Sequence, residues 1–163
     1  MKKLISLLLV VFTLALPSFS AFAAVGGEAA SDDYYISDED FAKLEHVDSE
    51  SNFISTYSSG LIQTTTLSLA KSGSTLIIKA TTKGSDAVKK CGFTYIKLQQ
   101  YKNGSWVNYK TYEDVYKEST SCTVTKSISA AKGYKYRVVA QHYAKKSLLS
   151  TEKISNSTST LSL

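Results

Sequence analysis

The feature that most constrains this chain is a tight turn that leads into a long alternating segment near its C-terminal end. Lys132-Gly133 marks the turn, and residues 134–143 read Tyr-Lys-Tyr-Arg-Val-Val-Ala-Gln-His-Tyr. In a strand, successive side chains point to opposite faces. One face would carry Tyr134, Tyr136, Val138, Ala140 and His142, and the other Lys135, Arg137, Val139, Gln141 and Tyr143. We predict a long strand here, around which the rest of the domain is arranged.

Short runs rich in Thr, Ser, Val, Ile and Tyr alternate with turns from Tyr57 onward, a pattern typical of an all-β sandwich. Asn103-Gly104 is the clearest turn, because a two-residue hairpin loop needs two residues with positive φ. The other predicted strands are 61–69, 75–82, 93–101, 105–112, 121–128 and one within 150–163, joined by predicted loops at 83–91, 113–120 and 144–149. The predicted inward-facing residues are Leu76, Ile78, Ala80, Ile96, Leu98, Cys122, Val124 and Ile128.

The segment from Ile128 to Ala140 carries a resemblance to a known family. An aliphatic residue, a Gly turn and Tyr-x-Tyr-x-Val-x-Ala resemble strand F of fibronectin type III and related immunoglobulin-like domains, although Ala130-Ala131 replaces the usual Pro. The resemblance implies a seven-strand sandwich in which Tyr134 forms the tyrosine corner. Residues 57–163 also resemble a group of uncharacterised small secreted proteins of Gram-positive gut bacteria, which brings no known activity.

The N-terminus has the three parts of a secretory signal peptide. Met1-Lys2-Lys3 is basic, Leu4–Leu16 is apolar apart from two residues, and Ala21-Phe22-Ala23 offers a cleavage site. The apolar run is too short for a membrane anchor, which needs about 20 residues. We therefore expect residues 1–23 to be removed, and a secreted, extracellular protein without a membrane span.

Charge is divided sharply along the chain. Residues 24–50 carry nine acids and one Lys, whereas residues 51–163 carry 16 Lys and Arg and five acids. The leader over residues 24–56 either stays disordered, or it folds back as a pro-segment or tether that screens a basic face. Of these two alternatives we favour disorder. The leader could also hold one short helix, capped by Ser37, in which Phe41, Leu44 and Val47 share a face.

The reactive residue types are few. Two cysteines in a secreted chain suggest a disulfide. Cys91 and Cys122 would open strands that start at one end of opposite sheets, so we favour a disulfide over two buried thiols. His142 is predicted to be packed rather than catalytic, and His46 lies in the acidic leader. Glu113-Asp114 is at most a weak acid pair. The sequence predicts no enzyme, no metal site and no cofactor.

The hairpin at Asn103-Gly104 defines a candidate surface. Its geometry pairs Tyr101 with Trp106, Lys97 with Lys110 and Tyr95 with Tyr112, and all would face outward if Ile96 and Leu98 face inward. Lys97 opposite Lys110 costs stability, which an anionic ligand or the acidic leader would relieve. The candidate ligand-binding residues are Trp106, Tyr95, Tyr101, Tyr112, Lys97, Lys110, Lys135 and Arg137.

Two readings of this surface stay open. Tyr, Trp, Thr and Lys are also ordinary residues of exposed strands, and a register shift of one residue would scatter the patch. As a ligand site, the face predicts a non-catalytic binding module for anionic wall polymer, glycan or an acidic protein surface. The alternative is a secreted cationic antimicrobial or toxin that the acidic leader masks until cleavage. Nucleic acid binding follows from charge alone and is interpreted as incidental.

Overall fold

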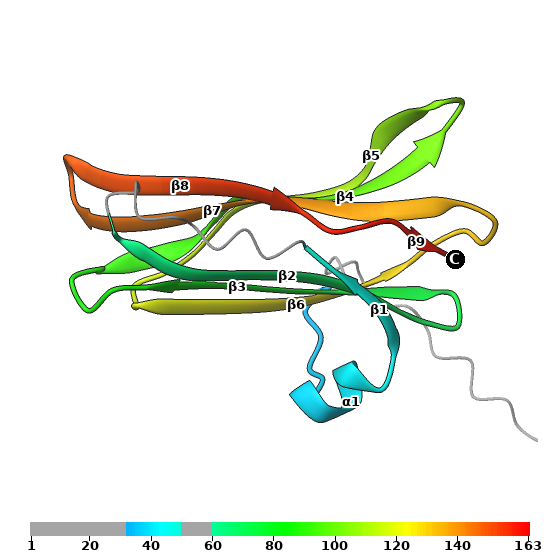
Figure 1. The fold of residues 1–163 in the computed structure, drawn as a ribbon, viewed down its shortest axis with the longest axis horizontal. Coiled ribbons are helices and arrows are strands. Elements are labelled where there is room, and N and C mark those ends of the chain that lie inside the picture. The colour runs from blue at the N-terminus through cyan, green and yellow to red at the C-terminus, as the bar shows by residue number, and fades with distance from the viewer. Residues whose placement is uncertain (1–31, 50–59) are drawn as a thin grey trace, which may run out of the picture. The chain divides into compact units, whose positions relative to one another are not determined.

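Two antiparallel sheets make up the protein in the computed structural model, which describes residues 32–49 and 60–163. One sheet has the strand order β1-β2-β3-β6 and the other β5-β4-β7-β8, with β9 pairing to β7 beyond the end of β8 (Figure 1). The elements within the described residues are α1 Asp38–Ala42, β1 Glu45–Asp48, β2 Ile62–Ser72, β3 Thr75–Gly84, β4 Lys90–Lys102, β5 Ser105–Lys117, β6 Ser121–Ser129, β7 Lys135–Ser147, β8 Ser150–Ser157 and β9 Leu161–Ser162.

The all-β prediction is confirmed, and β2 to β8 occupy the seven predicted segments. β4, β5 and β7 are each 13 residues long, so the predicted loops at 83–91, 113–120 and 144–149 are shorter than expected. β1 and β9 were not predicted, because four and two residues are too few to show an alternating pattern. The predicted signal peptide lies outside the described residues.

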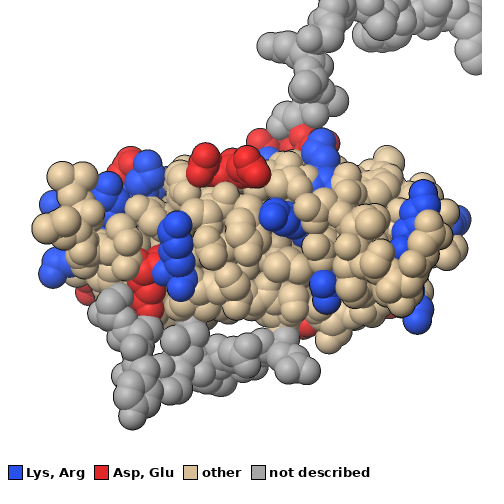
Figure 2. Space-filling model, turned by 90° about the horizontal axis from the view of Figure 1, so that it is seen from above, with Lys and Arg blue, Asp and Glu red and all other residues tan. Residues whose placement is uncertain are grey.

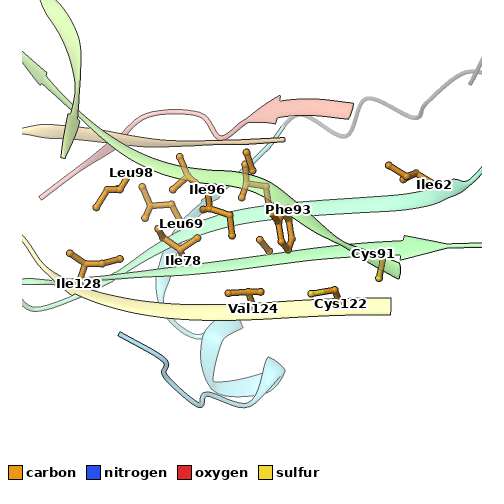
Figure 3. Packing of buried hydrophobic residues seen from close by; sticks show 14 of the residues in the cluster. Ile62, Leu69, Ile78, Cys91, Phe93, Ile96, Leu98, Cys122, Val124 and Ile128 are labelled. Carbon is orange, nitrogen blue, oxygen red and sulfur yellow. The ribbon is translucent and has the colours of Figure 1, made fainter. Parts of the chain in front are cut away.

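The main hydrophobic core fills the space between the two sheets. Leu69 and Ile78 project from one sheet toward Phe93 and Leu98 of the other (Figure 3). Burying each such side chain contributes roughly 1.5–3 kcal/mol. The predicted inward residues Leu76, Ile78, Ala80, Ile96, Leu98, Cys122, Val124 and Ile128 all belong to this core.

The resemblance implied a bond from the Tyr134 hydroxyl back to the preceding turn, and in the structure Tyr136 makes such a bond. The Tyr136 hydroxyl donates to the backbone oxygen of Ala131 at 2.8 Å and accepts from the Gln100 amide at 2.8 Å. Tyr136 is fully buried, whereas Tyr134 is 36% exposed and precedes the first residue of β7. Only the second tyrosine therefore enters the core deeply enough to reach back to the turn.

Residues 32–49 of the acidic leader are folded against the four-stranded sheet, which differs from the disorder that we favoured. Ser37 caps α1 as predicted, with its Oγ accepting from the Asp40 amide at 3.1 Å. Phe41 packs on Ala70 and Ile77, on the face of the sheet that turns away from the main core. Leu44 and Val47 do not lie on the helix, contrary to the prediction, because α1 ends at Ala42. Val47 lies in β1, which pairs with β2.

The expected disulfide is not formed. Cys91 and Cys122 are both free and fully buried, and they lie at the same end of the core (Figure 3). The Cys91 thiol contacts the backbone oxygen of Thr82 at 3.8 Å, and Thr82 pairs with Cys122 in the neighbouring strand. Burial raises the pKa of both thiols, that of Cys91 to about 11, so the reactive thiolate is disfavoured.

Candidate ligand-binding site

The β4–β5 hairpin has the turn that its sequence predicts. Asn103 and Gly104 have φ angles of 53° and 81°, and Lys102 pairs with Ser105. The next outward pair is Tyr101 with Trp106, as expected from a two-residue loop. The two rings meet edge to face, with centroids 5.3 Å apart and an interplanar angle of 61°.

The guanidinium group of Arg137 lies over the ring of Trp106. The Cζ atom of Arg137, on β7, lies 4.4 Å from the ring centroid. Arg137 Nε donates to Gln99 Oε1 at 2.9 Å, and Gln99 Nε2 donates to Asn108 Oδ1 at 3.0 Å. A row of polar contacts thus runs across β7, β4 and β5 and holds the guanidinium in one position. We call Tyr101, Trp106, Arg137 and Gln99 the Trp106 corner.

A groove of about 590 Å³ adjoins this corner. The groove forms beside β7, where the chain passes from β8 to β9. Between these two strands, the amide and the hydroxyl of Thr158 both bond to the backbone of Val138. β9 then pairs with β7 at Tyr136. The residues that line the groove are Arg137, Val139, Ser155, Asn156, Ser157, Thr158 and Ser159. The sequence offered this Ser- and Thr-rich stretch only as a terminal strand. Its hydroxyl and amide groups are therefore site residues that sequence reasoning missed.

Arg137 faces this groove without an acidic partner. No carboxylate of the described residues forms an ion pair with it, and its one hydrogen bond there is made by Nε. Within residues 32–49 and 60–163, the two terminal nitrogens of Arg137 form neither a side-chain hydrogen bond nor an ion pair. Because a guanidinium presents paired donors in a plane, this arrangement suits a carboxylate, a phosphate or a sulfate.

Two other predicted residues, Tyr95 and Lys97, lie on the same outer face in the middle of β4. The Lys97 ammonium sits 4.4 Å from the centroid of the Tyr95 ring. Lys97 is opposite Thr111 and Tyr95 is opposite Glu113. The predicted pairing of like charges is therefore absent. Lys135 is exposed on the same face, opposite Tyr101.

Lys110 and Tyr112 do not belong to the outer face, contrary to prediction. The register of β4 and β5 shifts between Leu98 and Gln99, which inserts Tyr109 as an extra residue. Lys110 then lies opposite Leu98, and Tyr112 lies opposite Ile96, on the side that faces the other sheet. A one-residue shift turns every later side chain to the other face.

There, both residues contact the leader through Asp32. The Lys110 ammonium is 2.7 Å from Asp32 Oδ2, and the Tyr112 hydroxyl donates to the same oxygen at 3.0 Å. The bond from Lys110 is the main cause of a lowered pKa for Asp32. Burial and the nearby carboxylate raise the pKa of Tyr112. These two residues thus bind the leader rather than form part of the Trp106 corner.

Three further leader acids pair with cations of the four-stranded sheet. Asp33 contacts Lys126 at 2.5 Å, Glu45 contacts Lys71 at 2.8 Å, and Asp38 contacts Lys79. The segment beside Asp33 also bonds to the edge of β6, through the Tyr34 amide and the Thr125 oxygen at 3.2 Å. The leader therefore runs from the β6 edge, across the sheet, to the β2 edge where β1 pairs.

Cations on the outer face of the five-stranded sheet are spread out rather than gathered. Figure 2 looks onto this face and shows Lys and Arg side chains separated by uncharged surface, with acidic side chains along the upper edge and at the lower left. Ligand recognition here would therefore depend on the local geometry of the Trp106 corner, and less on a broad basic field than the sequence suggested.

His142 is a packed core residue, as predicted. It is fully buried against Phe93, with ring centroids 4.9 Å apart. Its Nδ1 lies 2.8 Å from the Thr82 hydroxyl and its Nε2 lies 3.0 Å from Asn156 Oδ1. Burial lowers the pKa of His142 to about 4, so the ring is neutral near pH 7. Glu113 and Asp114 are exposed at the edge strand β5.

Comparisons of the chain with protein-family models, with curated proteins and with solved structures found no match. Within residues 32–49 and 60–163, no helix has the length and apolar character to cross a membrane.

Proposed function

We propose that this protein is a secreted, non-catalytic binding module for an anionic polymer of the cell surface, such as an acidic glycan or wall polymer. The observation that carries the proposal is the Arg137 guanidinium, stacked on Trp106 and fixed by Gln99 beside a polar groove. Aromatic rings offer flat apolar surface to a sugar ring, and the serine and amide groups of the groove offer hydrogen bonds to its hydroxyls.

We further propose that the fold is fibronectin III- or immunoglobulin-like. The support is the division of strands between sheets. β2, β3 and β6 lie in one sheet, and β4, β5, β7 and β8 lie in the other. In chain order they would correspond to strands A, B and E and to strands C, C′, F and G of such a sandwich. Immunoglobulin-type sandwiches divide their strands in this way.

The function is tested by binding of the chain from Ala24 onward to purified wall polymer and to an array of acidic and neutral glycans, at low and high salt. Trp106→Ala should abolish binding. Arg137→Lys keeps the charge but loses the planar pair of donors, and should weaken binding to an acidic ligand about tenfold. Lys153→Ala removes one exposed cation elsewhere on β8 and is the matched control, which should bind normally.

Three outcomes would count against the proposal. Equal binding of neutral and acidic glycans would remove the role of Arg137. A loss of binding in Lys153→Ala as large as that in Arg137→Lys would indicate a diffuse charge effect. Failure of every polymer and glycan to bind the unaltered chain would leave the Trp106 corner as sheet surface.

The second candidate, a cationic toxin masked by its leader, has one supporting observation. Leader carboxylates pair with Lys71, Lys79, Lys110 and Lys126. However, the leader also supplies β1 and the buried Phe41, so its removal would expose apolar surface. A killing assay before and after cleavage in the leader separates the two functions, since a binding module gains no killing activity.

A further inference from the structure

The turn between β7 and β8 presents two leucines to solvent. Leu148 is 87% exposed and Leu149 is 100% exposed, and the flanking Ser147 and Ser150 pair across the hairpin. The corresponding turns β2–β3, β4–β5 and β6–β7 contain Gly73, Gly104 and Gly133. Two adjacent leucines are unusual in a tight turn, where Gly, Asn and Asp are favoured for backbone reasons. Neither folding of the turn nor packing of the core explains them.

Lysines surround this tip. Lys145 and Lys146 precede it on β7, and the Lys89 amide donates to the Lys145 oxygen at 2.9 Å, which places Lys89 alongside. None of these three lysines forms an ion pair with a described carboxylate, in contrast to Lys90, which contacts Glu118 at 3.1 Å. The tip therefore combines exposed apolar side chains with unpaired positive charge.

We propose that the Leu148-Leu149 turn docks on the surface of an anionic lipid bilayer. Apolar side chains at a tip enter the boundary between headgroups and acyl chains, while nearby lysines stay at the level of the anionic headgroups. Each lysine near such a surface adds to the attraction. This proposal is independent of the function proposed for the Trp106 corner.

A protein partner fits this tip less well. A specific protein interface buries about 800 Å² on each side, and two leucines on a narrow turn supply a small convex contact instead. A second copy of the chain docked tip to tip would bring Lys145 and Lys146 of both copies together, and like charges across an interface are costly. A bilayer accepts a narrow tip because its lipids rearrange around it.

The position of the leucine turn on β7 also determines how the protein would be oriented on a bilayer. Arg137 and Ser147 both lie on β7, ten residues apart, and a strand rises about 3.3 Å per residue. The Trp106 corner and the leucine turn are thus at opposite ends of the same strand. A bilayer contact at the turn leaves the corner facing away from the lipid.

Vesicle co-sedimentation tests the proposal, with phosphatidylcholine vesicles that contain about one quarter phosphatidylglycerol and with pure phosphatidylcholine vesicles. The chain from Ala24 onward is used, because Leu4–Leu16 would itself bind lipid. The compact unit from Asp32 to Leu163 keeps its whole core in that chain. We expect binding to the anionic vesicles that weakens at high salt, and little binding to the neutral ones.

Two variants separate the contributions of the tip. Leu148→Ser combined with Leu149→Ser should weaken binding to anionic vesicles by at least about tenfold, since both side chains are exposed and their loss removes only the apolar contact. Lys145→Glu combined with Lys146→Glu should abolish the preference for anionic lipid. Val107→Ser, an exposed apolar residue near the β4–β5 turn, is the matched control and should bind like the unaltered chain.

A direct measurement of insertion uses Leu149→Trp, whose emission should shift to the blue with anionic vesicles while that of Trp106 stays constant. The proposal is overturned if the unaltered chain does not bind anionic vesicles, or if the leucine variant binds as well as the unaltered chain. It is also overturned if sedimentation shows self-association that the leucine variant loses, since the turn would then join copies of the chain.

Discussion

The guanidinium of Arg137 lies 4.4 Å from the ring of Trp106, although their strands are not neighbours in the sheet. β4 runs between β7 and β5, and Gln99 on β4 accepts a hydrogen bond from Arg137 Nε. The contact between Arg137 and Trp106 therefore spans the intervening strand β4, and does not join two residues that pair on adjacent strands. Trp106 is the single tryptophan of the chain, so its fluorescence reports on Arg137.

Arg137→Ala should shift the emission of Trp106 to longer wavelength, because the guanidinium shields one part of the ring from water. Steady-state fluorescence of the folded protein measures the shift. Lys153→Ala, which also removes one positive charge, should leave the spectrum unchanged. Equal spectra for the unaltered chain and Arg137→Ala would show that the two side chains do not stack in solution.

The buried imidazole of His142 predicts a loss of stability in weak acid. Its pKa is about 4 when folded, against about 6.5 for an exposed imidazole. Between these values the unfolded chain binds the proton and the folded chain does not, so the free energy of unfolding falls as the pH decreases. The total loss is about 3 kcal/mol between about pH 7.5 and about pH 4.

Urea unfolding at several pH values in this window measures the effect. His142→Gln cannot titrate, so its free energy of unfolding should change much less over the same range. Carboxylates with lowered pKa values, such as Asp32, lose their contribution below this window. A parallel decline in the unaltered chain and in His142→Gln would assign the acid sensitivity to other groups.

Cys91 and Cys122 should be unreactive in the folded protein. Both are fully buried, and burial raises their pKa values. At about pH 8 a thiol reagent should label neither in buffer and both in urea. A reducing agent should leave the thermal midpoint unchanged. A mass lower by two hydrogens in the intact protein, or a midpoint that drops on reduction, would show that the thiols pair.

Phe41→Ala should destabilise the protein by about 3 kcal/mol, because it removes the buried anchor of the leader on Ala70 and Ile77. Chemical unfolding measures the change. Tyr35→Ala is the matched control: this side chain is also aromatic and in the leader but is 90% exposed, so the change should stay within about 0.5 kcal/mol. If Phe41→Ala were as stable as the unaltered chain, the leader would not be part of the folded unit.

The sequence was sufficient for the elements that have a local cause. The turn at Asn103-Gly104 follows from residues that accept positive φ, and the cap at Ser37 follows from its hydroxyl. The alternating main-core residues of β3 and β4 follow from the face that each strand turns toward the other sheet. Each of these signals lies within a few residues.

The parts that were missed depend on contacts distant in sequence. The bulge at Tyr109 could not be recognised from the pattern of polar and apolar residues in β5. This edge strand has polar residues on both faces, and such strands specify their register weakly. Tyr134 and Tyr136 share a face in the sequence, and only the three-dimensional turn distinguishes which one is buried. The groove beside Arg137 forms where the chain passes from β8 to β9, and composition alone does not reveal it.

The course of the leader has a consequence for association between chains. Strand edges with unpaired amides and carbonyls recruit other strands, and the leader shields part of both edges of the four-stranded sheet. Tyr34 bonds to β6 at Thr125, and β1 covers β2 from Ser68 to Lys71. Removal of the leader would therefore open these parts of β2 and β6 to pairing with strands of other molecules.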